Sequence, residues 1–187
     1  YSGQCLISSL IGKRSGNRGM CASSCRKRYN GNEYLLSAKD LCLLPNLQEL
    51  EDSGIKTIKI EGRMKPAEYV AKTTSEYRRQ IDSLTGKPLT VGKERIDSLK
   101  MAFNREFTSG YFSGEKKIVD HLIPGNRGIL LGTINWDKLI LEEDLDLYDG
   151  IGILVRGKRE GFYVNKILVD GKEVQHASRG EEVKIPH

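Results

Sequence analysis

Apolar residues recur every three or four positions in several stretches of the chain, which is the spacing of one face of an α-helix. Four apolar residues cluster in this way within residues 6–11, and a second short pattern covers residues 96–103. The longest periodic stretch runs over residues 66–84 and is followed by Gly86, a residue type that commonly ends helices. The pattern therefore predicts two short helices and one long one.

Residues 34–60 show short apolar pieces that alternate with helical ones. Ser37 and Asp40 have the character of a capping box, so a helix is predicted to begin there, to be divided by Pro45 and to end at Gly54. Residues 55–60, IKTIKI, are β-branched and alternate as a strand does. Strands that alternate with helices predict parallel pairing in an α/β architecture, and so few of them suggest the tail end of a larger sheet or barrel.

After residue 124 every segment is short, rich in β-branched residues and closed by a turn. The predicted strands cover residues 128–134, 139–142, 151–156, 162–169, 172–177 and 182–185, separated by turns such as Asp149-Gly150 and Asp170-Gly171. Such a series predicts a small closed or sandwiched β domain. We therefore divide the chain into an α/β region at residues 1–86, a linker with a short helix at residues 87–116, and an all-β domain at residues 117–187.

Composition and the start of the chain narrow the class of protein. Of the 187 residues 38% are hydrophobic, as in ordinary globular proteins. No apolar run approaches the ~20 residues of a membrane helix, and no signal peptide is recognisable, so we expect a soluble cytoplasmic protein. Because the chain begins with Tyr1 in what looks like the middle of a motif, we expect it to be part of a longer protein.

Positive charge is concentrated near the start of the chain. Lys and Arg number 30 against 25 Asp and Glu, but no acid precedes Glu33. The basic residues of this stretch are Lys13, Arg14, Arg18, Arg26, Lys27 and Arg28. Their field suits phosphate or carboxylate groups, and the neighbouring Tyr29 and Tyr34 could stack a base of RNA. A solvated basic surface is the alternative interpretation.

All four cysteines lie in the first quarter of the chain. Cys5, Cys21, Cys25 and Cys42 have the spacing C-x15-C-x3-C-x16-C. In a chain without export signals we expect reduced thiols, which serve as metal ligands, catalytic groups or buried small residues. The Gly-rich segments between them can fold back as a 4Fe-4S cluster requires, and a zinc site drawn from this stretch would be all-thiolate. A thiol nucleophile needs a base, but the histidines lie much later, at His121, His176 and His187.

Several motifs, read together and in order, resemble a known family. They are Ser2-Gly-Gln-Cys5, Asn17-Arg-Gly-Met-Cys21, Cys25-Arg26, Ser37-Ala-Lys-Asp-Leu-Cys42, Lys59-Ile-Glu-Gly-Arg-Met-Lys65 and Phe103-Asn-Arg-Glu-Phe-Thr-Ser-Gly-Tyr111. In this order and spacing they resemble the collagenase-like peptidases of unknown catalytic type, peptidase family U32. The resemblance spans essentially the whole chain.

The resemblance implies a fold and a cofactor. Residues 1–86 would be the C-terminal part of a modified TIM-type barrel, followed by a small C-terminal β-barrel. Cys5, Cys21 and Cys42 match ligands of an iron-sulfur cluster, whose fourth ligand would be a cysteine upstream of this chain. Cys25 is then a bystander, or the fourth ligand if the chain is self-sufficient. Several relatives act in the hydroxylation of transfer RNA wobble uridine, ribosomal RNA or ubiquinone precursors.

The resemblance also places candidate catalytic residues after the predicted strand at residues 55–60. In a barrel, residues just past the carboxyl end of a strand line the active face, and here these are Glu61, Arg63 and Lys65. Arg63 is suited to clamp a carboxylate or phosphate while Glu61 orients it or moves a proton. The alternative is a turn in which Glu61 and Arg63 pair. For Asp40 we favour a helix-capping role.

Three functions remain as hypotheses. The first is an iron-sulfur protein that hydroxylates transfer RNA, with tRNA as its partner. The second is a collagenase-like endopeptidase that acts on a peptide substrate. The third is a non-enzymatic homodimer or scaffold bridged by zinc. The resemblance favours the first.

Overall fold

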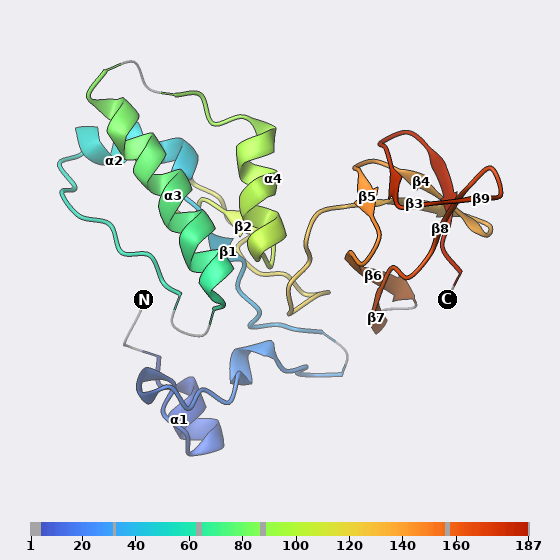
Figure 1. Cartoon of the computed structure of the whole chain (residues 1–187). Helices are drawn as coiled ribbons and strands as arrows, with labels where there is room; N and C mark the ends of the chain where they lie inside the picture. Colours follow the sequence, from blue (N-terminus) through green and yellow to red (C-terminus); the bar gives the residue numbers. More distant parts are fainter. Residues whose placement is uncertain (1–4, 32, 63–64, 87–88, 156–157, 187) are drawn as a thin grey trace. The chain divides into compact units, whose positions relative to one another are not determined.

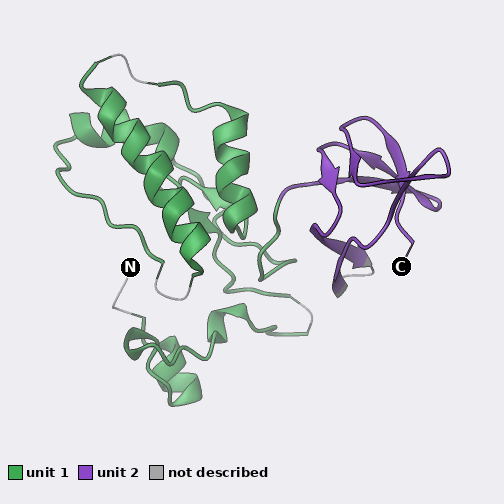
Figure 2. Ribbon diagram, viewed as in Figure 1, with its two compact units in different colours: residues 1–128 green, residues 129–187 purple. Residues whose placement is uncertain are grey.

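The computed structural model describes residues 5–31, 33–62, 65–86, 89–155 and 158–186. It divides into two compact units, Tyr1–Gly128 and Ile129–His187 (Figure 2). We refer to them as unit 1 and unit 2. The predicted β domain begins at residue 117, whereas residues 117–128 belong to unit 1, where Val119 forms a β-bridge with Ala38.

Unit 1 contains the helices of the described part of the chain (Figure 1). They are α1 (Ile7–Gly12), α2 (Leu47–Asp52), α3 (Ala67–Leu84) and α4 (Lys93–Ala102), together with 3₁₀ turns at Gly16–Arg18, Ser24–Arg26 and Leu44–Asn46. Helices α1, α3 and α4 confirm the predictions from periodicity. No described helix is both long and apolar enough to cross a membrane.

The helix predicted to begin at Ser37 is wrong at its start. Residues Asp40–Leu41 form the short strand β1, which pairs in parallel with β2 (Phe107–Thr108), and α2 begins only at Leu47. The reason is that the Asp40 carboxylate accepts hydrogen bonds from the Arg105 backbone amide and guanidinium instead of capping a helix. Pro45 lies in the 3₁₀ turn, and Gly54 has the positive φ of 85° expected at a helix end.

The strand predicted at residues 55–60 is also not formed in the part of the chain that the structure describes. Ile58 packs against the core of unit 1, while Ile55 and Ile60 are exposed. An alternating segment becomes a strand only when a neighbour completes its backbone hydrogen bonds, and no described strand pairs with this one. The β1–β2 pair is the one parallel ladder in the described residues, so a portion of a TIM barrel is not confirmed.

The core of unit 1 lies between its helices. Its buried residues are Leu44, Leu47, Leu50 and Leu99, and side chains of α3 such as Tyr77 pack against them. Helices α3 and α4 are further joined by Arg95, whose Nε donates to Glu76 Oε2 over 2.7 Å and whose Nη1 donates to Gln80 Oε1 over 2.5 Å. Unit 1 is therefore held by a small apolar cluster supplemented by a partly buried ion pair.

Unit 2 is made of short antiparallel strands (Figure 1). They are β3 (Gly132–Asn135), β4 (Lys138–Leu141), β5 (Leu145–Asp146), β6 (Gly150–Val155), β7 (Lys158–Tyr163), β8 (Ile167–Val169), β9 (Lys172–Val174), β10 (His176–Ala177) and β11 (Glu182–Lys184). Five of them form one sheet in the order β3-β4-β11-β8-β9, and β5–β10 and β6–β7 form separate pairs. The all-β character is as predicted, but no closed barrel is present in the described residues.

The core of unit 2 follows from alternation along these strands. Six residues are buried together: Leu141, Leu145, Val164, Ile167, Ala177 and Val183. The predicted turn Asp170-Gly171 connects β8 and β9, and both of its residues have positive φ, 49° and 76°. These are the dihedrals of the tight hairpin turn that Asp-Gly favours.

Candidate anion-binding site

The parallel pair β1–β2 brings an acid and a base together from distant parts of the chain. Asp40 opens β1 and Arg105 lies just before β2, and the Asp40 amide donates to the Glu106 carbonyl over 2.8 Å. Asp40 Oδ2 accepts the Arg105 backbone amide at 2.9 Å, and Oδ1 accepts its Nε at 3.0 Å. This forked contact fixes the guanidinium in one orientation.

Two further cations interact electrostatically with the same carboxylate. Arg26 is held by its Nη1, which donates to Ser37 Oγ over 2.7 Å and to the Ala38 carbonyl over 2.6 Å, just before β1. The Lys65 ammonium lies over the ring of Phe103 at the end of α4. We call Arg26, Asp40, Lys65 and Arg105 the Asp40 cluster.

The Asp40 cluster contains three cations and one carboxylate, and a second carboxylate, Asp120, also acts on Arg26. Burial, together with the nearby Arg105 and Arg26, lowers the pKa of Lys65 to about 8, and Asp40 offsets only part of this effect. The pKa of Arg26 is also lowered, first by burial and then by Arg105. An anion placed among these side chains would relieve both effects, because an opposite charge stabilises each cation.

Aromatic rings form one wall of the Asp40 cluster. Tyr69 of α3 and Phe103 pack edge to face with ring centroids 6.3 Å apart, and the Arg105 guanidinium carbon is 5.3 Å from the Phe103 centroid. The ring faces attract the cations and keep water from one side of them. Charge interactions are stronger where water is excluded, so the arrangement favours binding of an anionic group.

Of the predicted catalytic residues, Lys65 and Glu61 lie in different surroundings. Lys65 belongs to the Asp40 cluster. Glu61 is exposed and lies 3.0 Å from Lys59 Nζ, and its backbone carbonyl accepts the Tyr69 hydroxyl. Arg63 lies outside the described residues.

Sequence reasoning missed Arg105 and assigned Asp40 to a helix cap. The two residues are 65 positions apart, and no local pattern links them. The available signal was that each belongs to one of the motifs that carry the family resemblance.

The predicted anion-contacting arginines divide into two kinds. Arg14 and Arg18 are exposed near α1, while Arg26 is half-buried in the Asp40 cluster. Arg28 is exposed, but its guanidinium lies 5.3 Å from the centroid of Tyr34 and its Nε donates to the tyrosine hydroxyl over 3.2 Å. Of the four arginines, Arg26 is the one whose charge contributes to lowering the pKa of Lys65.

The cysteines are not gathered into one donor set. Cys5 and Cys21 are exposed, Cys25 is half-buried, and the Cys42 thiol lies 3.9 Å from the Tyr77 hydroxyl against the core of unit 1. Burial raises the pKa of the Cys42 thiol. Within the described ranges no three His, Cys, Asp or Glu side chains lie together as a metal site. The described thiols are therefore not gathered as ligands of one site, and the metal centre stays a prediction.

Unit 2 contains a serine, a histidine and an acid in a chain of contacts that sequence reasoning did not foresee. His176 Nδ1 lies 2.7 Å from Asp146 Oδ1, and its Nε2 lies 3.4 Å from Ser178 Oγ. The hydrogen bond to Asp146 raises the pKa of His176, and both side chains are exposed. The Ser178 amide donates to Glu181 and the Gly180 amide to Leu141, so neither is free to stabilise an oxyanion.

Comparison with known proteins shows to which family the chain belongs. The sequence profile of peptidase family U32 matches residues 1–121, a range that includes the whole Asp40 cluster. The chain belongs to peptidase family U32. No solved structure matches it.

Three relatives illustrate the range of names within the U32 family. The chain is 32% identical to Uncharacterized protease MJ0090 of Methanocaldococcus jannaschii, over 98% of this chain and 52% of the relative. It is 35% identical to tRNA hydroxylation protein P1 of Bacillus subtilis, over 61% and 31%, and 28% identical to a collagenase of Porphyromonas gingivalis, over 99% and 51%. The chain therefore spans about half the length of two of these U32 relatives and about a third of the other.

Proposed function

We propose that this chain is part of a cytoplasmic enzyme that hydroxylates transfer RNA at the wobble uridine, and that the Asp40 cluster holds an anionic group of its substrate. The observation that carries the proposal is the set of three cations around one carboxylate in the part of the chain matched by the U32 family. The similarity to tRNA hydroxylation protein P1 supports RNA as the substrate class.

The side chains of the Asp40 cluster have distinct parts in binding. Asp40 locks Arg105, and Ser37 and the Ala38 carbonyl lock Arg26, so both guanidinium groups are ordered before an anion arrives. Groups fixed in advance lose less conformational freedom on binding. A phosphate or carboxylate that contacts them gains charge-assisted hydrogen bonds.

Lys65 is the candidate proton carrier. With a pKa of about 8, its Nζ exists in both protonation states near neutral pH, so it can give a proton to a substrate oxygen or take one from it. Binding of an anion next to Nζ would raise this pKa and favour the ammonium form. Lys65 would then donate in the bound state and recover a proton after release.

The iron-sulfur cluster, with zinc as the alternative, stays a prediction from the family resemblance. The proposed anion binding and proton transfer at the Asp40 cluster involve neither metal. Iron and zinc analysis of the full-length protein, prepared without oxygen, tests it directly. A colourless and metal-free preparation would contradict it.

Nucleoside analysis of transfer RNA tests the proposed function. In cells that lack the gene, the full-length protein should restore hydroxylated uridine, whereas Lys65→Met and Arg105→Gln should restore less than about a tenth of it, because removing a charged hydrogen-bonding group from a site costs roughly 1.5–3 kcal/mol. Arg78→Gln is the matched control, since Arg78 pairs with Asp82 on the exposed face of α3. Restoration by both cluster variants at the level of Arg78→Gln would reject the proposal.

A collagenase-like endopeptidase is the second candidate. The similarity to the Porphyromonas gingivalis collagenase and the contacts of Ser178, His176 and Asp146 favour it. It ranks below the first because His176 and Asp146 are exposed and the Ser178 amide already donates to Glu181. Cleavage of gelatin that Ser178→Ala abolishes would reverse this order.

A further inference from the structure

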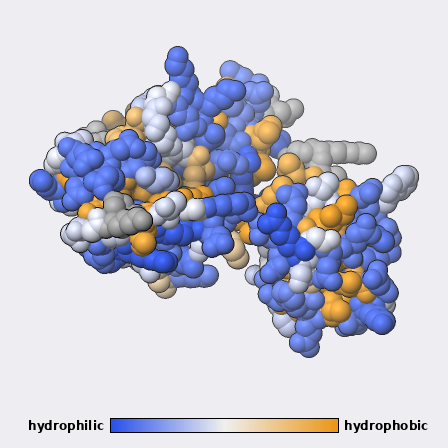
Figure 3. Space-filling view, turned by 90° about the horizontal axis from the view of Figure 1, so that it is seen from above, coloured by the Kyte–Doolittle hydropathy of each residue, from blue (hydrophilic) through white to orange (hydrophobic). Residues whose placement is uncertain are grey.

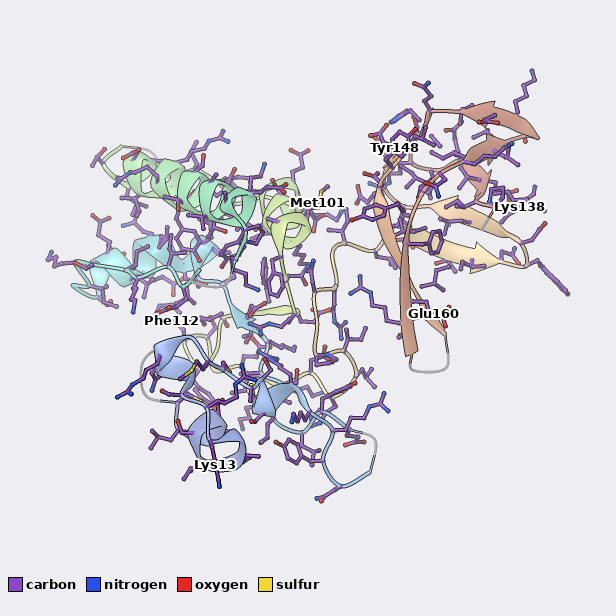
Figure 4. All side chains as sticks on the ribbon, turned by 60° about the horizontal axis from the view of Figure 1, so that its bottom comes forward. Lys13, Met101, Phe112, Lys138, Tyr148 and Glu160 are labelled. Carbon is purple, nitrogen blue, oxygen red and sulfur yellow. The ribbon has the colours of Figure 1, made fainter. Side chains whose placement is uncertain are left out.

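The loop after β2 presents two aromatic rings to solvent. Tyr111 is 77% exposed and Phe112, labelled in Figure 4, is 42% exposed. The side chain of Leu41, at the end of β1, lies beside this loop next to Gly110 and is 63% exposed. Removing aromatic rings of this size from water is favourable. Two neighbouring exposed rings on one loop therefore indicate a binding surface.

The loop is fixed in place rather than loosely attached. Glu115 Oε2 accepts hydrogen bonds from the Thr108 hydroxyl and the Ser109 amide, which closes the two ends of the loop on each other. Between them the Gly110 amide donates to Thr108 Oγ1 over 2.9 Å.

Two successive turns complete the loop. The Phe112 amide donates to the Ser109 carbonyl, and the Gly114 amide donates to the Tyr111 carbonyl. Gly110 and Gly114 have positive φ of 62° and 72°, a conformation that side chains disfavour. The backbone therefore holds Tyr111 and Phe112 in an exposed position before any ligand is present.

The charge of the loop is positive where it meets solvent. Its one acid, Glu115, is engaged by the loop itself and by Lys39, whose Nζ lies 3.6 Å from Oε1. Lys116 and Lys117 follow and are both exposed. Unit 1 as a whole holds 22 basic against 14 acidic residues. An anionic partner with flat apolar surfaces matches this combination.

We propose that residues 109–117 bind single-stranded RNA, with bases stacked on Tyr111 and Phe112 and phosphates contacted by Lys116 and Lys117. Every base has a π-face, so such stacking tolerates many sequences, and the lysines add affinity that depends on salt. The choice of RNA rests on the proposed function, and the assignment deepens it by naming the surface that receives the strand. The adjacent cations favour RNA over a protein partner, because they can contact its phosphates.

Fluorescence anisotropy with a short labelled oligouridine and the full-length protein tests the stacking. Tyr111→Ala and Phe112→Ala should each weaken Kd at least about fivefold, the lower end of the range for one stacked base. Phe112→Leu keeps an apolar side chain but removes the ring, so it should weaken Kd nearly as much. Tyr148→Ala is the matched control, because Tyr148 is 70% exposed in unit 2 and should leave Kd unchanged.

The lysines are tested through the salt dependence of the same binding. Replacing both Lys116 and Lys117 with Gln should make the slope of log K against log salt shallower by about 1.4, or about 0.7 for each phosphate that a lysine no longer neutralises. An unchanged slope would remove the lysines from the proposal.

Three results would overturn the assignment. The first is an oligouridine affinity that Tyr111→Ala and Phe112→Ala leave unchanged. The second is an equal loss of affinity in Tyr148→Ala. The third is a lower melting temperature or altered oligomeric state with unchanged RNA affinity, which would make the loop a protein contact. Failure of the proposed function is separate, because it is read from tRNA nucleosides with the Asp40 cluster variants.

Discussion

The two units of this protein differ in the balance of apolar and polar contacts among their described residues. Unit 2, with 8 basic and 11 acidic residues, gathers six buried apolar residues into one core within Ile129–His187. Unit 1 spans Tyr1–Gly128, has 22 basic and 14 acidic residues, and gathers four buried apolar residues in the part that the structure describes. Apolar side chains also reach the surface of both units (Figure 3). Unit 1 therefore depends more on polar contacts.

The ion pairs of the two units differ in the same sense. In unit 2 they are exposed, such as the cross-strand pair Lys138–Glu182 and the pair between Lys184 of β11 and Asp137 of the β3–β4 turn. In unit 1 the pairs Arg95–Glu76 and Arg105–Asp40 are mostly shielded from water. Exposed pairs contribute little to stability, whereas breaking a shielded pair leaves an uncompensated charge. The proposed anion-binding site of unit 1 therefore lies on a framework that shielded ion pairs help to hold.

The largest expected effect comes from the apolar core of unit 2. Ile167→Ala removes a fully buried side chain and should lower the free energy of unfolding of unit 2 by about 2–5 kcal/mol. Leu154→Ala, at a site that is 52% exposed in β6, is the control and should cost less than about 1 kcal/mol. Urea unfolding, monitored by hydrogen exchange in unit 2, measures the free energy of unfolding of both variants. Similar values for the two variants would contradict the apolar account of unit 2.

A smaller loss is expected when the shielded pair of unit 1 is broken. Asp40→Ala leaves Arg26, Lys65 and Arg105 facing one another and should destabilise unit 1 by about 1–3 kcal/mol, less than a fully buried pair because the side chains are 20% and 26% exposed. Asp82→Ala breaks the exposed pair with Arg78 on α3 and should cost about 0.5 kcal/mol or less. Added phosphate should restore part of the loss in Asp40→Ala alone. Equal losses in both variants would mean that shielding of the Asp40–Arg105 pair does not add to the stability of unit 1.

The same contrast explains what the sequence could and could not predict. In unit 2, alternation and Asp-Gly turns act over a few residues, so the short strands and the turn at Asp170-Gly171 were predictable. The long helix α3 was predictable for the same reason, since its apolar face and Gly86 are local signals. Closure of strands into a barrel depends on distant pairings, and that prediction was wrong for the described residues of unit 2.

Unit 1 could not be predicted in this way because its key contacts are distant in sequence. Ser37 and Asp40 satisfy the local pattern of a helix start, but Asp40 is bound by Arg105 instead. The alternation at residues 55–60 predicts a strand, yet it lacks a partner in the described structure. For the site, the basic stretch indicated Arg26, and the motif after residue 60 indicated Lys65. That both interact with the carboxylate of Asp40 depends on the tertiary structure, which no local pattern encodes.

The smallest expected effect is on pH dependence, where the two units should differ in sign. Lys65 has a folded pKa of about 8 against an ordinary value of 10.5, so its charge disfavours folding below pH 8. This penalty is relieved as the pH rises from 8 to 10.5, and the stability of unit 1 should increase over that window. His176 has a folded pKa above its ordinary 6.5, because it bonds to Asp146. Its stabilising contribution is complete below pH 6.5 and is lost as the pH rises through the folded pKa.

Hydrogen exchange read separately for each unit between pH 5.5 and 10.5 measures these opposite trends. Lys65→Met should flatten the rise in unit 1, while Lys72→Met, at an exposed position of α3, should leave it in place. His176→Gln should flatten the fall in unit 2 without changing unit 1. A rise in unit 1 that survives Lys65→Met would mean that the desolvated cation of the Asp40 cluster is not its source. Since an anion bound at the cluster favours the ammonium form, added phosphate should move the rise of unit 1 to higher pH and leave unit 2 unaffected.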